Sequence, residues 1–345
     1  MEAFWHVPAR FGVARIFGPS YSLRCVVFHN ISSADSPFTR GINVSTAPEE
    51  FEAALRFLTA HYTAVRLDQV LADAEGRKLP PRAVLVTFDD AYASVAEVAA
   101  PLCRKFGVPA LFFVNAAFLD NQRLAPDNLV CFVASVLGLK TINAAARSVR
   151  GLNHHELESL AEVFGVFFPS LTLEERGEFL AALRQMTGID EQRLAEEAGL
   201  YLSSSQLRAF ASFDFEIGNH TYTHGHCRTF SPSDFSQEIQ ANKDQLEAIS
   251  GTTVRSFSLP YGSSRDLTSD LKACLEQSGH EAVFLSESVA NCQGAERFHL
   301  DRVNASTANE GALFFDIEVL PRLRVMRNRL LGSPSSAPTH ALRAS

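Results

Sequence analysis

Short apolar segments alternate with amphipathic helical patterns through most of this chain. The apolar segments are residues 25–30, 83–88, 109–115, 215–219, 255–260, 281–285 and 297–303. The helical patterns between them are residues 49–62, 95–107, 233–251 and 266–279. Such alternation is typical of a parallel sheet, because each helix carries the chain back to the start of the next strand. The sequence therefore predicts an α/β fold, either a barrel or a doubly wound sheet.

The alternation stops between about residues 120 and 208. Helical patterns follow one another there, at 171–186, 190–199 and 203–212, and Thr172 and Glu175 form a capping-box pattern. We therefore predict a helical insertion within a larger domain. The predicted organisation is an N-terminal extension (1–22), a main domain (23–315) that contains the insertion, and a basic, partly disordered tail (316–345).

The formal net charge of the chain is −8. Nucleic-acid binding needs a surplus of Lys and Arg, so we expect no nucleic-acid partner. The sequence has no apolar run of the roughly 18 residues that a membrane span requires, and its first residues lack the pattern of a secretory signal. Its six cysteines form no CxxC pair. These features predict a cytoplasmic protein with free thiols.

The segment after Glu318 contains five Arg and no acidic residue. Its first part has the pattern of a short basic helix, and its end has the composition of a disordered terminus. Two interpretations stay open for the helix. It is either a solvated surface helix or a peripheral contact with a partner or with the inner face of the membrane.

Polar residues follow several of the predicted strands. In parallel α/β folds the active site lies at the carboxyl ends of the strands, so these residues are expected to share one rim. They are His29, the pair Asp89 and Asp90, the group Asn219, His220 and His224, the segment Pro260-Tyr261-Gly262, and the pair Asp301 and Arg302.

The segment GNHTYTHGH at 218–226 places His220 and His224 four residues apart. Two imidazoles and one carboxylate form a three-ligand site for a zinc-type ion with an open position. Such an ion lowers the pKa of a bound water to about 7. The Asp pair and the His pair each have a structural explanation as well, since Asp is common in turns and paired histidines occur without metals. Because both pairs are present and each follows its own predicted strand, we predict a metal site.

The doubled carboxylate fits a metal-dependent hydrolase. Such an enzyme needs one carboxylate on the metal and another that accepts a proton. If Asp90 is the ligand, Asp89 is left to act as the general base. Adjacent residues in a tight turn can point in different directions, so one strand end can supply both groups.

Three segments resemble motifs of the polysaccharide deacetylases of carbohydrate esterase family 4, which share the NodB-homology domain. They are TFDD at 87–90, HTYTH at 220–224 and FSLPYG at 257–262. The resemblance covers about 23–118 and 209–304. It implies a distorted (β/α) barrel with about seven strands, and metal-dependent removal of acetyl groups from sugars.

The resemblance also implies roles for individual residues. Asp89 is the expected general base, and Asp90, His220 and His224 are the expected ligands of a divalent metal ion. Zinc is the first choice for that ion, with cobalt, nickel, manganese or iron as alternatives. The backbone N–H near Tyr261 is expected to stabilise the oxyanion of the tetrahedral intermediate.

The sequence departs from the family pattern in places. Ser258 stands where many members have an Arg that orients the catalytic Asp, and Arg302 is the candidate substitute because its guanidinium can bind a carboxylate with two hydrogen bonds. A structural surface pair is the alternative for Arg302. The late Leu-x-x-His segment that supplies the general acid is not evident. His29 matches a pocket histidine of a glucosamine-polymer subgroup, with a structural histidine as the alternative.

These features predict a metal-dependent deacetylase that acts on an N-acetylated sugar, either a polysaccharide or oligosaccharide or a glycan precursor. One alternative is an amide hydrolase that acts on a nucleotide-linked sugar, a lipid-linked sugar or a small metabolite. Another is a catalytically silent glycan-binding protein on the same fold. We expect an N-acetylated carbohydrate as the substrate in the first case.

Overall fold

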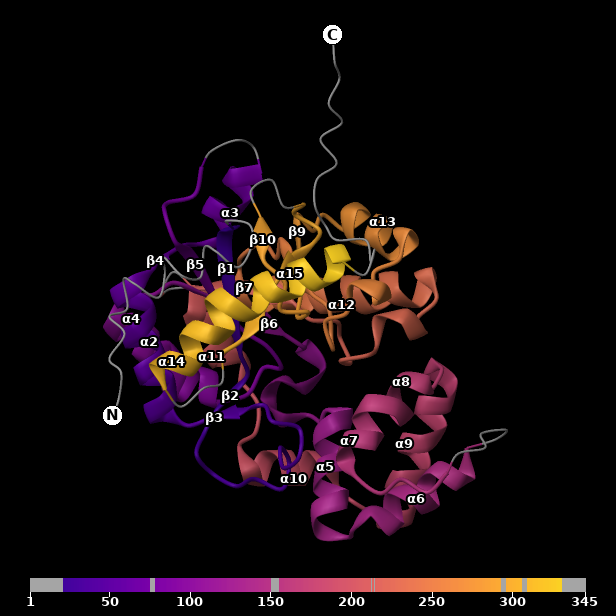
Figure 1. The fold of residues 1–345 in the computed structure, drawn as a ribbon. Helices are drawn as coiled ribbons and strands as arrows, with labels where there is room; N and C mark the ends of the chain where they lie inside the picture. Colours follow the sequence, from indigo (N-terminus) through magenta and orange to yellow (C-terminus); the bar gives the residue numbers. More distant parts are fainter. Residues whose placement is uncertain are drawn as a thin grey trace.

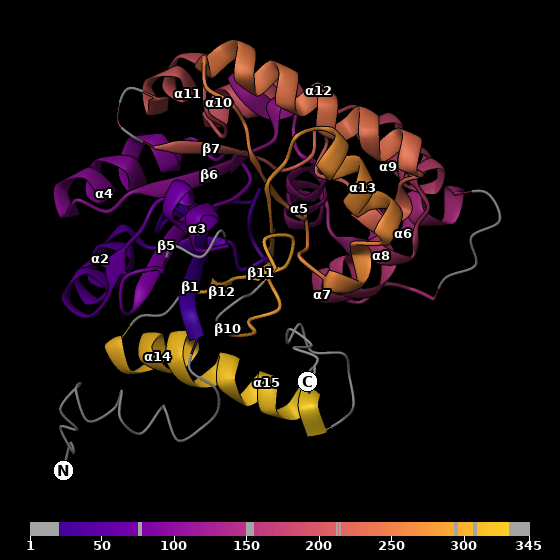
Figure 2. The ribbon, with the colours of Figure 1, turned by 90° about the horizontal axis from the view of Figure 1, so that it is seen from above.

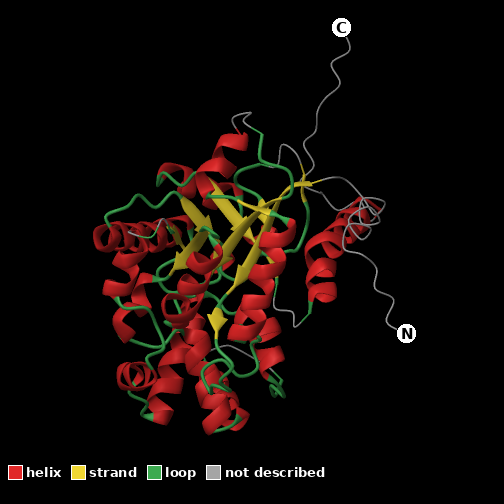
Figure 3. Cartoon of the chain, turned by 90° about the vertical axis from the view of Figure 1, so that its left-hand side faces the viewer, coloured by secondary structure: helices red, strands yellow, loops and turns green. Residues whose placement is uncertain are grey.

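The computed structural model describes residues 21–74, 78–149, 155–211, 213, 215–292, 296–305 and 309–330. Its main sheet follows the strand order β10-β1-β5-β6-β7-β8-β9-β11, with β12 and β4 joined at the side. All neighbouring strands of this sheet are parallel except β1 and β10. The sheet forms a nearly closed barrel inside a layer of helices (Figure 3). The predicted distorted (β/α) barrel is confirmed.

The strands of the barrel lie close to the predicted apolar segments. Their bounds are β1 (Tyr21–Phe28), β4 (Thr63–Ala64), β5 (Ala83–Phe88), β6 (Ala110–Val114), β7 (Glu216–Asn219), β8 (Ser256–Ser258), β9 (Ala282–Leu285), β10 (Asn291–Cys292), β11 (Leu300–Asp301) and β12 (Val303–Asn304). Every residue of β5 is buried, because both faces of a parallel barrel strand are covered. A second, two-stranded sheet pairs β2 (Asn30–Ile31) with β3 (Ser45–Thr46).

The two edges of the barrel meet at Arg302. β11 pairs with β9, β12 pairs with β1, and Arg302 is the one residue between β11 and β12. The prediction of one strand over 297–303 is therefore wrong. The chain leaves the β9 edge at Asp301 and joins the β1 edge at Val303, so no single strand can pair with both.

Helices cover the outside of the barrel. They are α2 (Pro48–His61), α3 (Leu67–Ala74), η2 (Val95–Ala99), α4 (Ala100–Phe106), α12 (Pro232–Ser250), η6 (Ser264–Asp266) and α13 (Ser269–Gln277). α4 and α12 end at Gly107 (φ 65°) and Gly251 (φ 69°), which adopt the left-handed conformation common after a helix. The predicted helix over 95–107 therefore ends at the expected glycine.

The predicted helical insertion lies beside the carboxyl end of the barrel (Figure 1). Its helices are α5 (Pro126–Val136), α6 (Leu139–Ser148), α7 (Leu160–Glu162), η4 (Val163–Phe167), α8 (Phe168–Ser170), α9 (Leu173–Thr187) and α10 (Glu191–Ala198), between η3 (Ala116–Asn121) and α11 (Ser204–Ala211). They enclose an apolar core of their own, which includes Phe168 and Phe179. Thr172 and Glu175 form both hydrogen bonds of the predicted capping box.

The C-terminal helices cross one side of the barrel (Figure 2). They are α14 (Glu310–Phe314), η7 (Phe315–Val319) and α15 (Leu320–Leu330). The buried Glu318 carboxylate accepts hydrogen bonds from Arg24 (2.8 Å), the Tyr62 hydroxyl (3.0 Å) and Arg322 (2.5 Å). The Arg324 side chain donates to the Glu287 carbonyl. The predicted tail helix exists; one face, with Arg322 and Val325, is buried on the barrel, and the other, with Leu323 and Met326, is exposed.

This packing gives no support to the predicted membrane contact of the tail, because Arg322 and Arg324 form their contacts inside the protein. Residues 331–345 and most of the predicted extension at 1–22 lie outside the described residues. Among the helices that the structure describes, none has the length and apolar character to cross a bilayer.

Replacing Glu318 with Gln should lower the free energy of unfolding at pH 7 by about 3–5 kcal/mol, because two buried guanidinium groups then face a neutral amide in place of a carboxylate. Burial alone would raise the pKa of Glu318, but Arg24 and Arg322 hold it below its usual value. The stabilisation is therefore present above the unfolded-state pKa of about 4.3 and is lost as the pH falls through the lower folded-state pKa. Urea unfolding at pH 7 and in acid measures both effects.

The control is Glu197→Gln, which breaks an exposed helical pair with Arg193. This variant should change the free energy of unfolding by less than about 1 kcal/mol. Equal effects of the Glu318 and Glu197 variants at pH 7 would contradict the assignment of Glu318 as a buried structural anion.

Candidate active site

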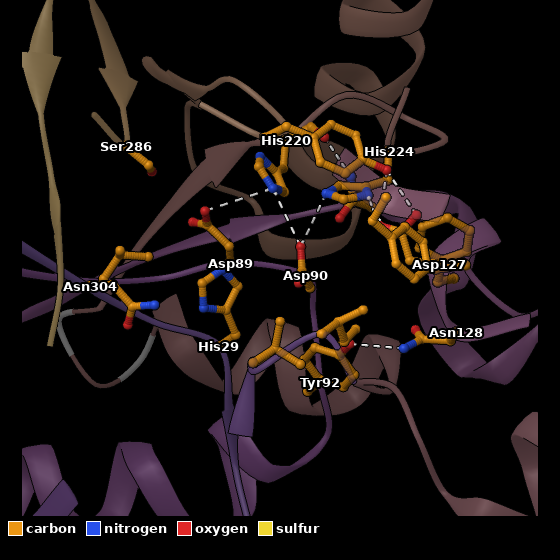
Figure 4. A pocket seen from close by; sticks show the side chains of 18 of the residues that line it. His29, Asp89, Asp90, Tyr92, Asp127, Asn128, His220, His224, Ser286 and Asn304 are labelled. Atoms are coloured by element: carbon orange, nitrogen blue, oxygen red, sulfur yellow. Dashed lines mark hydrogen bonds and ion pairs between the residues drawn. The ribbon is translucent and has the colours of Figure 1, made fainter. Parts of the chain in front are cut away.

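A cavity of about 390 Å³ lies at the carboxyl ends of the barrel strands. Six of the seven residues predicted for the site line it: His29, Asp89, Asp90, His220, His224 and Tyr261. Arg302 lies behind Asp89 and contacts it. The side chains converge from the ends of β1, β5, β7 and β8 (Figure 4).

Asp90, His220 and His224 form a compact group with metal-ligand chemistry. The Asp90 Oδ1 atom lies 3.4 Å from His220 Nε2 and 3.3 Å from His224 Nε2. Each Nδ1 atom faces another acceptor, the Ser258 carbonyl at 2.8 Å for His220 and the Asp127 carboxylate at 3.2 Å for His224. An acceptor at Nδ1 fixes the ring orientation and leaves Nε2 to bind a metal. The residues therefore fit a divalent metal ion.

The backbone at these strand ends adopts a conformation that is unfavourable for residues other than glycine. Asp90 (φ 73°), His224 (φ 55°) and Tyr261 (φ 62°) all have left-handed backbone angles. Such residues persist only where the surrounding structure holds them, and they gather at functional sites. The turn after β5 directs Asp89 toward Arg302 and Asp90 toward the two histidines.

Asp89 and Arg302 form a buried pair with two hydrogen bonds. Both Nη–Oδ distances are 2.7 Å, and the two residues are 4% and 1% exposed. Arg302 also donates to the Ser258 hydroxyl at 2.7 Å, and this hydroxyl lies 3.4 Å from Asp89. Arg302 is therefore not a surface residue. It binds Asp89 and also contacts Ser258, the position at which the family pattern has an Arg.

The electrostatic environment keeps both carboxylates ionised. Burial alone would raise the pKa of Asp89, but the charges of Arg302 and His220 outweigh it and hold the pKa below its usual value. Burial has the same effect on Asp90, and His224 and His220 hold its pKa well below the usual range. The pair therefore carries two negative charges at neutral pH, one beside a guanidinium and one beside two imidazoles.

Asp127, which was not predicted as a site residue, comes from the first turn of α5 in the insertion. The Tyr261 hydroxyl donates to its two carboxylate oxygens at 2.8 and 2.9 Å, and its Oδ2 atom lies 3.2 Å from His224 Nδ1. An acidic residue in the first turn of a helix is common for reasons of helix stability. No local pattern therefore distinguishes Asp127 from the other acids at helix starts.

Two further histidines lie close to predicted site residues: His226 beside Tyr261, and His299 beside Asp301, the neighbour of Arg302. His226 is 6% exposed and stacks on Tyr261 with a centroid distance of 3.7 Å. Burial and the charge of Arg176 lower its pKa to about 3, so it is neutral and not solvent-exposed. His299 lies beside Glu287 and Asp301 and is not among the described residues that line the cavity.

Comparisons with known proteins agree with this geometry. Residues 76–283 match the sequence profile described as polysaccharide deacetylase. A comparison with curated protein sequences gave no significant match.

Several solved structures share the fold. The Streptococcus pyogenes deacetylase PplD in complex with acetate is 13% identical, with a TM-score of 0.58 over 87% of this chain and 99% of that one. IcaB from Ammonifex degensii is 17% identical, with a TM-score of 0.54 over 88% and 98%. A de-N-acetylase from Aggregatibacter actinomycetemcomitans is 15% identical, with a TM-score of 0.54 over 85% and 99%. At these identities the similarity concerns the fold.

Proposed function

This chain belongs to the polysaccharide deacetylase family, and we propose that it is a metal-dependent hydrolase that removes acetyl groups from an N-acetylated sugar. One observation carries the proposal: two adjacent carboxylates have different main partners. Asp89 forms two hydrogen bonds with Arg302 and lies 3.7 Å from His220, whereas Asp90 lies 3.3–3.4 Å from both His220 and His224. This arrangement supports one base and one metal ligand at the same strand end, the two roles that a metal-dependent amide hydrolase needs.

Asp90, His220 and His224 would hold the metal ion, for which zinc is our first choice because zinc sites commonly combine imidazole and carboxylate ligands. A bound divalent cation supplies Lewis acidity, which polarises the acetyl carbonyl and makes a water molecule more acidic. The Ser258 carbonyl and the Asp127 carboxylate keep the Nε2 atoms of the two histidines turned toward Asp90.

Asp89 accepts the proton of the attacking water in this proposal. Its pKa is lowered, so the carboxylate is ionised at neutral pH and has a free position for a proton. Arg302 holds both carboxylate oxygens, which fixes the direction of the side chain. The base is thus positioned without being a metal ligand itself.

His29 and Tyr261 complete the proposed machinery. His29 lines the cavity, and we assign to it the proton that the leaving amine requires. The N–H of Gly262 donates to the Leu259 carbonyl at 3.1 Å, so we assign oxyanion stabilisation to the preceding N–H, that of Tyr261.

Acetate release tests this proposal. The purified chain would be incubated with N-acetylglucosamine oligomers, UDP-N-acetylglucosamine and lipid-linked N-acetyl sugars, with and without a chelator. We expect release from at least one substrate and its loss after chelation. Absence of release from every member of the panel by metal-loaded protein would overturn the proposal and favour a silent glycan-binding protein.

Replacing Asp127 with Asn should weaken metal binding about 10- to 100-fold, because His224 loses the anionic acceptor at Nδ1. Competition with a chromophoric chelator measures this affinity. The matched control is Asp270→Asn, because Asp270 occupies the equivalent position in the first turn of α13, away from the cavity. If both variants bind metal equally well, Asp127 acts only as a helix-start residue.

A further inference from the structure

The helical insertion contributes one wall of the proposed active site. Its residues Ala125, Asp127, Asn128, Leu160, Ala161 and Phe164 all line the cavity. Figure 4 shows Asp127 and Asn128 on one side of Asp90, and Ser286 and Asn304 on the other. The barrel alone therefore does not define the space in which a substrate binds.

The insertion contacts the barrel on both sides of this wall. A β-carbon at Gly41 would lie 2.7 Å from the Leu160 Cδ1 atom, so the loop between β2 and β3 packs directly on α7. On the other side, Asp127 accepts the two hydrogen bonds from Tyr261. The Arg176 guanidinium also donates to the His224 carbonyl at 3.1 Å. These contacts close the space between the insertion and the strand ends.

The insertion wall has an apolar part and a polar part. Leu160, Ala161 and Phe164 form the apolar part, where α7 packs on the loop that carries Gly41. Asp127 and Asn128 form the polar part, and His29, Ser286 and Asn304 add side chains from the barrel that can hydrogen-bond sugar hydroxyls. A hydroxyl that is buried without a partner costs about 1–3 kcal/mol. A neighbouring sugar unit therefore has no favourable place along the apolar wall.

The size of the cavity supports the same conclusion. Its volume of about 390 Å³ lies near the lower end of the roughly 300–1,000 Å³ found for small-molecule sites. A unit in the interior of a polysaccharide carries a neighbour on each side, and both neighbours need open space. A terminal unit needs such space on one side only.

We propose that this site accepts a single terminal N-acetylated sugar and excludes the interior units of a polymer. The terminal sugar is either the end of an oligosaccharide or one sugar attached to a carrier. This inference rests on the proposed deacetylase function and specifies the substrate class of the same site.

The test counts acetyl groups lost from each substrate molecule. Metal-loaded full-length protein would be incubated with the fully acetylated N-acetylglucosamine pentamer and, separately, with UDP-N-acetylglucosamine, and the products analysed by mass spectrometry. We expect each pentamer to lose at most one acetyl group, from a terminal unit. The rate with UDP-N-acetylglucosamine, compared with that of the pentamer, shows whether a carrier-linked sugar or an oligosaccharide end is the better substrate. Loss from interior units by the unaltered protein would overturn this inference and leave the deacetylase function intact. Absence of release from both substrates and from lipid-linked N-acetyl sugars would overturn both.

Variants of the wall provide the second measurement. Phe164→Ala or Leu160→Ala should raise kcat/KM for interior units at least about tenfold, the usual scale of one contact in a hydrophobic pocket. Val166→Ala, on the same turn but 58% exposed, should leave the product distribution unchanged. Circular dichroism would verify that each variant is folded. Folded wall variants that still release only one acetyl group would contradict the assignment of this wall as the barrier.

Discussion

Asp89→Asn should reduce acetate release by about 10²- to 10⁴-fold while the bound metal is retained. Asn has almost the same shape as Asp but cannot accept the proton of the attacking water. The metal-ligand atoms belong to Asp90, His220 and His224, and the nearby Asp89 Oδ2 lies 3.7 Å from His220 Nε2, beyond hydrogen-bond distance, so Asn should leave the ligand set in place. The measurement combines steady-state acetate release with metal analysis of the same protein sample.

Asp90→Asn is the matched control, because it changes the adjacent carboxylate in the same way. This variant should lose metal as well as activity, since Asp90 is the one carboxylate of the ligand group. If Asp89→Asn loses the metal and Asp90→Asn keeps it, the two assignments must be exchanged. If Asp89→Asn retains full activity, Asp89 is not the base.

Arg302→Leu should lower the free energy of unfolding by about 3–5 kcal/mol and also abolish activity. The reason is that Arg302 is 1% exposed and donates two hydrogen bonds to the buried Asp89. Without Arg302, burial of Asp89 is opposed mainly by His220, so its pKa rises from the present lowered value. The loss of stability is therefore greatest at neutral pH, where the unfolded chain keeps Asp89 ionised. Urea unfolding of metal-free protein measures it.

Two further variants make this result specific to the pair. Arg193→Leu removes an exposed ion pair with Glu197 and should cost less than about 1 kcal/mol. The double variant with Asp89→Asn and Arg302→Leu should be more stable than the sum of the single changes predicts, because neither charge is then left unpaired. Additive effects would show that the two residues do not stabilise each other.

The core strands of the barrel could be predicted because burial on both faces leaves an uninterrupted apolar run. β5 matches the predicted segment 83–88 residue for residue. The pattern of strands and helices alone left a barrel and a doubly wound sheet open, because barrel closure depends on the pairing of the short strands β11 and β12 with β9 and β1. The position of the C-terminal helix likewise depends on contacts distant in sequence, such as Arg24 with Glu318.

In the candidate site, too, some residues could be predicted from the local sequence and others depend on contacts distant in sequence. The side chains that follow strand ends, such as Asp89, Asp90 and His220, could be placed on one rim because parallel strands end together. The chemistry of Arg302 indicated a carboxylate partner, but its burial depends on the barrel closure. Asp127 belongs to an insertion whose docking no local pattern indicates, so its contact with His224 required the structure.

The most direct test of the account is a metal titration of metal-free protein, with acetate release and metal occupancy measured on each sample. The account predicts that activity is absent without metal, rises in proportion to occupancy and reaches its maximum at one ion per chain. The same titration of Asp89→Asn should reach full occupancy without activity. Full activity of the metal-free protein, or a fully occupied site in the unaltered protein with no release from any N-acetylated sugar, would contradict the account.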